Sequence, residues 1–260
     1  MEEMTLVKYQ VANRVATITL NRPEKRNALN AEMVTQLKQA FTQAEEDENA
    51  KVIVLDAAGD SFCAGADLAY LQQLQNNTFE ENLADSNHLK ELFLQIYQHP
   101  KVVIAKIQGH AIAGGCGLAT VCDFSFTVPE AKFGYTEVRI GFIPAIVKVF
   151  LLRKIGEGKA KSLLLTGELI PAELAESMGL VNTVVEAIDL DMEVANFAQM
   201  LVQKNSGQSM AFTKQMIAAV QSMDVEEGLS YAAEMNAKAR ASEDCQKGIA
   251  AFLNKEKIVW

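Results

Sequence analysis

The sequence contains no long apolar run. None of its hydrophobic stretches reaches the ~18 residues that a membrane-spanning helix needs. Its first four residues, Met-Glu-Glu-Met, lack the basic start and apolar core of a secretory signal. We therefore expect a cytoplasmic protein with no membrane partner.

Positive charge is also in short supply. Lys and Arg number 24 against 33 Asp and Glu, which leaves a net charge of −9. Nucleic-acid surfaces need clustered cations to match the phosphates, so this balance argues against an RNA or DNA partner. A small anionic ligand stays possible, because a few local cations or one helix N-terminus can bind it.

Cysteine and histidine are too few and too scattered to indicate a metal site. The sequence has three histidines and four cysteines, and the cysteines are Cys63, Cys116, Cys122 and Cys245. None of them has zinc-like spacing, so we expect reduced structural thiols and no metal. Nothing beside Cys116 in the sequence would lower its pKa, so we interpret it as a packed side chain and not as a nucleophile.

Strand patterns and helix patterns alternate along the first two thirds of the chain. The predicted strands are residues 6–11, 15–20, 52–55, 102–107 and 124–128. Helical periodicity lies between them at 31–47 and about 82–98. This alternation indicates an α/β fold. Because the pattern becomes helical from Leu190 onward, we predict a core over residues 1–195 and a helical lid or oligomerisation region over residues 196–260.

Two loops of small residues follow predicted buried strands, at residues 61–68 and 109–118. Small residues let a ligand approach the backbone closely, and ligands of open α/β sheets sit beyond the carboxyl ends of the strands. The second loop also opens a helix, whose first amides carry partial positive charge. Either loop alone could be only a tight turn. Two loops that aim amides at one point could stabilise an oxyanion as it forms.

The order and spacing of several motifs resemble the crotonase (enoyl-CoA hydratase/isomerase) family. The matching stretches are Asn21–Pro23, Asn27–Leu29, Phe62–Leu68, Gly109–Cys116, Cys122–Asp123, Phe133–Gly141, Leu165–Gly167 and Ala175–Val181. The resemblance implies a spiral of ββα repeats with a helical C-terminal region that forms a homotrimer or a dimer of trimers. It also implies an acyl-CoA thioester substrate, with coenzyme A as part of the substrate and no separate cofactor.

The same resemblance assigns roles to individual positions. The amides of Ala66 and Gly114 would form an oxyanion hole for the thioester oxygen, and Glu137 would transfer protons. The positions that match the CoA and substrate site are Lys25, Arg26, Ala64, Asp67, Leu68, Gly115, Phe252 and Lys255. Ordinary solvated surface charge is the alternative for the three cations.

Gly117 departs from the pattern of the family's hydratases. They usually carry a glutamate at this position, and glycine cannot transfer a proton. A single carboxylate suits an isomerase, which only moves a proton between carbons. However, Gly117 together with residues Glu137–Ala145 resembles bacterial hydratases proposed for methylglutaconyl-CoA in leucine breakdown. We therefore expect an enoyl-CoA hydratase, with a double-bond isomerase and a non-catalytic acyl-CoA-binding protein as alternatives.

Overall fold

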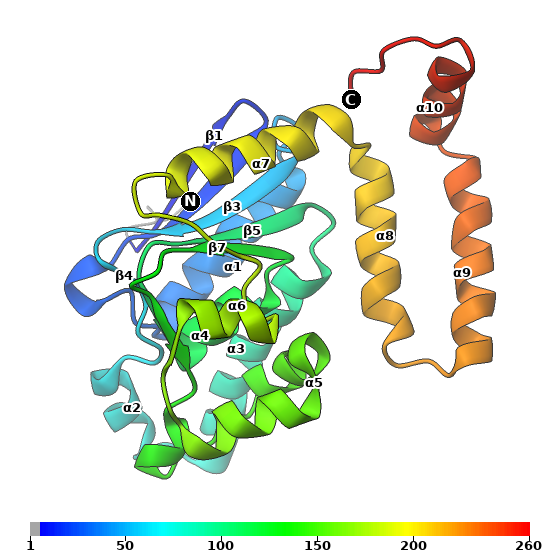
Figure 1. Ribbon diagram of the computed structural model, residues 1–260. Coiled ribbons are helices and arrows are strands. Elements are labelled where there is room, and N and C mark those ends of the chain that lie inside the picture. The colour runs from blue at the N-terminus through cyan, green and yellow to red at the C-terminus, as the bar shows by residue number, and fades with distance from the viewer. Residues whose placement is uncertain (1–5) are drawn as a thin grey trace.

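The strands of the computed structural model, which describes residues 6–260, form two sheets (Figure 1). The larger sheet has the order β1-β2-β3-β5-β7-β10 and the smaller one the order β4-β6-β8-β9. The larger sheet contains β1 (Val7–Ala12), β2 (Val15–Leu20), β3 (Val52–Ala57), β5 (Val102–Ile107), β7 (Phe124–Thr127) and β10 (Thr183–Val184). The smaller sheet contains β4 (Ser61–Cys63), β6 (His110–Ile112), β8 (Lys132–Gly134) and β9 (Ile170–Pro171).

The chain repeats one path three times. In the pairs β3–β4, β5–β6 and β7–β8, the first strand joins the larger sheet and the second joins the smaller sheet. Neighbouring repeats pair in parallel in both sheets, whereas β1 and β9 run antiparallel to their neighbours β2 and β8. The predicted spiral of ββα repeats is therefore confirmed.

Helices cover the sheets and connect the repeats. They are η1 (Pro23–Lys25), α1 (Ala31–Glu46), α2 (Leu68–Leu74), α3 (Phe79–Gln98), α4 (Gly114–Val121), η2 (Glu137–Ile140), α5 (Val147–Thr166), α6 (Ala172–Met178), α7 (Leu190–Lys204), α8 (Gly207–Val220), α9 (Val225–Arg240) and α10 (Glu243–Leu253). Asn30 begins α1 as predicted, because its side chain accepts a hydrogen bond from the Met33 amide. In β3 and β5, successive residues are buried on both faces of the sheet instead of alternating between buried and exposed. The continuous apolar runs at residues 52–55 and 102–107 predict this pattern.

The last three helices stand beside the core. Figure 1 shows α8 and α9 as a hairpin at one side, with α10 above it, while α7 lies on the strands of the larger sheet. The division into residues 1–195 and 196–260 stays a prediction, and α7 extends across that boundary. No helix within residues 6–260 combines the length and the apolar character needed to cross a membrane.

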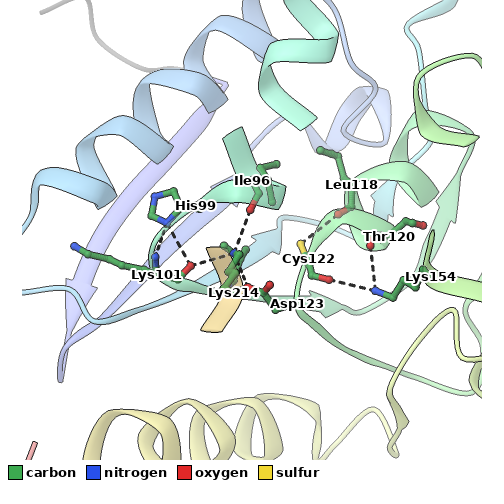
Figure 2. Close-up of polar contacts among 10 residues, drawn as sticks. Ile96, His99, Lys101, Leu118, Thr120, Cys122, Asp123, Lys154 and Lys214 are labelled. Carbon is green, nitrogen blue, oxygen red and sulfur yellow. Dashed lines mark hydrogen bonds and ion pairs between the residues drawn. The ribbon is translucent and has the colours of Figure 1, made fainter. Parts of the chain in front are cut away.

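A buried lysine ties α8 to the core. Lys214 is the buried residue of α8, and its Nζ lies 2.6 Å from Oδ2 of Asp123. The ammonium also donates hydrogen bonds to the carbonyls of Ile96 at 3.2 Å and Lys101 at 3.3 Å (Figure 2). The same Asp123 oxygen accepts a bond from the Val103 amide. One side chain of α8 thus joins the ends of α3, β5 and α4.

Candidate active site

The first small-residue loop leaves one backbone amide free. Leu29 donates to the carbonyl of Gly65 at 2.7 Å, and its own carbonyl accepts from the Asp67 amide at 2.8 Å. These two bonds form a parallel bridge that directs the intervening Ala66 amide away from Leu29. Ala66 is exposed, and its amide has no acceptor within residues 6–260.

The second loop enters α4 through an uncommon backbone conformation. Ala113 has φ 49° and ψ −122°, a region that side-chain-bearing residues rarely adopt. Its amide donates to the Gly134 carbonyl at 2.7 Å, and its carbonyl accepts from the Gly117 amide at 3.0 Å. These bonds hold the turn in place. The next residue, Gly114, is the first of α4, so its amide has no partner within the helix.

The two loops touch each other at glycine. Gly65 has φ +90°, and a Cβ built on it would lie 2.8 Å from Cβ of Ala113 and 3.5 Å from the amide nitrogen of Gly114. Only glycine allows this approach. The free amides of Ala66 and Gly114 therefore belong to adjoining backbone segments, as two donors to one oxygen would require.

Glu137 contributes an unpartnered carboxylate. It begins η2, its side chain is half-buried, and its Oε2 atom is buried with no hydrogen-bond partner among residues 6–260. Burial raises the pKa of this carboxyl. The preceding Tyr135 is fully buried, with its hydroxyl 2.8 Å from Oγ1 of Thr120. A buried polar atom without a partner is uncommon and marks a candidate for proton exchange.

Position 117 has no room for a side chain. A Cβ built on Gly117 would lie 2.3 Å from Cγ1 of Val147 and 2.8 Å from Cε1 of Phe93. The departure from the hydratase pattern is therefore more than a missing acid. Apolar side chains from α3 and α5 fill the space in which a carboxylate at this position would begin.

The predicted CoA-binding residues near the first loop lie together. Lys25 and Arg26 are exposed at η1, and the Arg26 carbonyl accepts a hydrogen bond from the Ala64 amide at 3.0 Å. The Asp67 carboxylate makes contacts within the chain. It pairs with Arg22 at 2.6 Å and accepts hydrogen bonds from the first amides of α2. Burial alone would raise the pKa of Asp67, but these hydrogen bonds outweigh it and lower that pKa.

The remaining predicted positions divide into two groups. Leu68 is 77% exposed beside the loops, and Gly115 is buried so closely that a Cβ on it would lie 2.2 Å from the Cys63 carbonyl oxygen. Phe252, at 83% exposure, lies in α10, and Lys255 follows that helix. Figure 1 shows α10 far from α2 and β4, so one chain does not bring these two residues to the loops.

Cys116 and a groove beside α8 are two further features of residues 6–260. Cys116 is fully buried, and burial raises its pKa to about 12, which agrees with a packed thiol. Within residues 6–260, no group of three or more His, Cys, Asp or Glu side chains could hold a metal ion. A groove of about 830 Å³ lies between the core and α8–α10, and none of the predicted site residues lines it.

Comparison with known proteins agrees with this spiral fold. The family model described as enoyl-CoA hydratase/isomerase matches residues 10–260. An enoyl-CoA hydratase from Shewanella pealeana superposes with a TM-score of 0.94 at 30% identity, covering 100% of this chain and 97% of that structure. The fold is therefore the crotonase fold.

Proteins related in sequence identify the family of this chain. A Thermus thermophilus protein whose name assigns it to the enoyl-CoA hydratases is 42% identical over 241 residues, or 93% of this chain and 95% of the relative. A crotonyl-CoA hydratase from Syntrophomonas wolfei is 36% identical over 248 residues, or 94% of this chain and 93% of the relative. The chain belongs to the enoyl-CoA hydratase/isomerase family.

Three features of the site escaped the sequence analysis. The positive φ of Ala113 has no signature in the residue type, because alanine does not favour it. Val147 and Phe93 lie 30 and 24 residues from Gly117 in the sequence, and no local pattern links them. For Gly65, the available signal was a glycine that follows a buried strand directly before the proposed donor.

Proposed function

We propose that the chain is an enoyl-CoA hydratase that adds water with one carboxylate, Glu137, opposite the backbone donors Ala66 and Gly114. Membership of the enoyl-CoA hydratase/isomerase family and the named hydratase relatives support the reaction class. The observation that carries the proposal is the buried Oε2 of Glu137, which has no partner among residues 6–260.

One carboxylate can complete the reaction in two proton transfers. Ionised Glu137 takes a proton from water while the hydroxide oxygen bonds to C3 of the 2-enoyl thioester. The C2–C3 π electrons move toward the carbonyl, and the enolate oxygen accepts hydrogen bonds from Ala66 and Gly114. Protonated Glu137 then returns its proton to C2, which regenerates the carboxylate and the thioester carbonyl. The net change is the addition of one water, so no redox cofactor takes part.

The packing at position 117 favours a second candidate, a double-bond isomerase. Val147 and Phe93 exclude a second acid there, and isomerisation needs only one. Glu137 would remove the C2 proton of a 3-enoyl thioester to form a dienolate. It would then give that proton to C4, which leaves the double bond between C2 and C3.

The proposal extends to the acyl group of the substrate. Methylglutaconyl-CoA is a candidate substrate because Gly117 and residues Glu137–Ala145 match the pattern attributed to its hydratases.

The oligomeric state that we propose is a homotrimer or a dimer of trimers. It is supported by the exposure of Phe252, Leu253 and Ile249 on α10, at 83%, 72% and 54%.

The test follows each product in D₂O. Purified protein is incubated with 2-enoyl, 3-enoyl and methylglutaconyl CoA thioesters, and mass spectrometry reads the products. Water addition indicates the hydratase, and deuterium exchange or double-bond migration without water addition indicates the isomerase. Glu137→Gln should lower kcat by about 10²–10⁴. The matched control Glu130→Gln, at an exposed carboxylate before β8, should keep wild-type turnover.

The pH profile adds a second readout. A proton-accepting Glu137 must be ionised, and burial raises its pKa. Turnover should therefore fall as the pH drops, at a higher pH than the ordinary glutamate pKa of about 4.3. Wild-type turnover in Glu137→Gln would refute the role of this residue. Binding of acyl-CoA without turnover of any thioester in the panel would support the non-catalytic alternative.

A further inference from the structure

We propose that Val147 sets the depth of the acyl pocket and restricts the site to short acyl groups. This inference rests on the proposed function, because it takes the Gly114 amide as a donor to the thioester oxygen. Gly117 lies three residues after Gly114, on the same face of α4 and about 4.5 Å further along its axis. An acyl chain that runs along α4 from the thioester would therefore reach Gly117.

The path along α4 is closed at that point. The position where a Gly117 Cβ would stand is 2.3 Å from Cγ1 and 3.1 Å from Cβ of Val147. The Val147 side chain therefore lies directly over the glycine, and only 5% of its surface is exposed. The Cε1 atom of Phe93 closes the same space at 2.8 Å.

The closing side chains are held from both sides. Val147 begins α5, which packs along α4, so its backbone is fixed by the helix. Phe93 is fully buried in α3, and its ring stacks on Phe150 with centroids 6.3 Å apart. Phe150 lies three residues after Val147 on α5 and therefore on the same side of that helix. A longer acyl chain would have to displace this packed group.

Binding of saturated thioesters tests the pocket without requiring turnover. Isothermal titration calorimetry gives the dissociation constants of butanoyl-CoA and octanoyl-CoA for the full chain. Wild type should prefer butanoyl-CoA. Val147→Ala should shift the ratio of the two constants at least about tenfold toward octanoyl-CoA, which is the lower end of the effect of one methylene in an apolar pocket. The control Val149→Ala, at a 44% exposed position of the same helix, should leave the ratio unchanged.

The outcomes separate this inference from the proposed function. An unchanged ratio in a folded Val147→Ala would overturn the role of Val147. If that variant does not fold, Val147→Ile should shift the ratio further toward butanoyl-CoA, and an unchanged ratio would again overturn it. A wild type that binds neither thioester would instead overturn the proposed function. Turnover that survives Glu137→Gln would remove the proposed chemistry but leave the binding ratio as the test of the pocket.

Discussion

Replacement of Lys214 by alanine should destabilise the fold strongly. The ammonium pairs with Asp123 at 2.6 Å and donates to the carbonyls of Ile96 and Lys101, and only 9% of its side chain is exposed. Its removal leaves a carboxylate that burial already disfavours, since burial raises the Asp123 pKa. Loss of one partner from a buried pair typically costs about 3–5 kcal/mol. Urea unfolding followed by circular dichroism measures the free energy of unfolding.

An exposed ion pair provides the control for this experiment. Lys238 pairs with Glu234 at 2.7 Å on α9, with both side chains more than half exposed. Lys238→Ala should leave the free energy of unfolding nearly unchanged, because exposed ion pairs contribute little to stability. Hydrogen exchange should also show faster opening of α8 in Lys214→Ala, because Lys214 is the buried residue of that helix. If both variants lose equally little stability, the buried pair does not hold α8 on the core.

Two further predictions concern buried His99 and the contact of the two loops. Burial lowers the pKa of His99 to about 4, so the unfolded chain binds its proton first, and stability should fall by up to about 1.4 kcal/mol per pH unit as the pH drops from about 6.5 toward 4. Urea unfolding measured across that pH range should show that the free energy of unfolding changes less steeply with pH in His99→Gln than in wild type. An equal pH dependence in the two proteins would contradict the low pKa of His99. Gly65→Ala should lower kcat/KM by about 10²-fold, because its Cβ would lie 2.8 Å from Cβ of Ala113 and displace the two amides. Gly158→Ala, whose Cβ meets nothing within 4 Å, is the control, and equal turnover in both variants would show that the loop contact is not needed.

Local patterns predict much of the core. The cap at Asn30 and the apolar runs of β3 and β5 each depend on residues close together in the sequence, and the structure confirms them. The placement of α8 could not be predicted in the same way. One of the contacts of α8 with the core is made by Lys214, whose partner Asp123 is 91 residues away. In the sequence, no neighbouring residue distinguishes Lys214 from a lysine that points to solvent.

Local sequence patterns also predict only part of the candidate site. Small residues after buried strands indicated where backbone donors could stand, and the structure brings Ala66 and Gly114 into adjoining segments. The sequence alone indicates that position 117 lacks an acid, because glycine stands there. That Val147 fills the space beside Gly117 is a property of tertiary packing, because the two residues lie 30 positions apart and meet where α5 packs on α4.

At the C-terminal ends of several helices, the last backbone carbonyls accept hydrogen bonds from a lysine that lies elsewhere in the chain. Lys101 donates to carbonyls at the end of α1. Lys154 donates to the Thr120 and Cys122 carbonyls at the end of α4, and Lys51 donates to the Val202 and Asn205 carbonyls at the end of α7. Helices α1 and α4 have no basic residue in their own last turn.

These helix ends are therefore completed only when distant segments have already come together. A fragment that contained α1 or α4 alone would leave its last carbonyls to water and would fray there. The arrangement links the completion of secondary structure to the assembly of the whole chain, which favours cooperative folding over the stepwise addition of preformed helices.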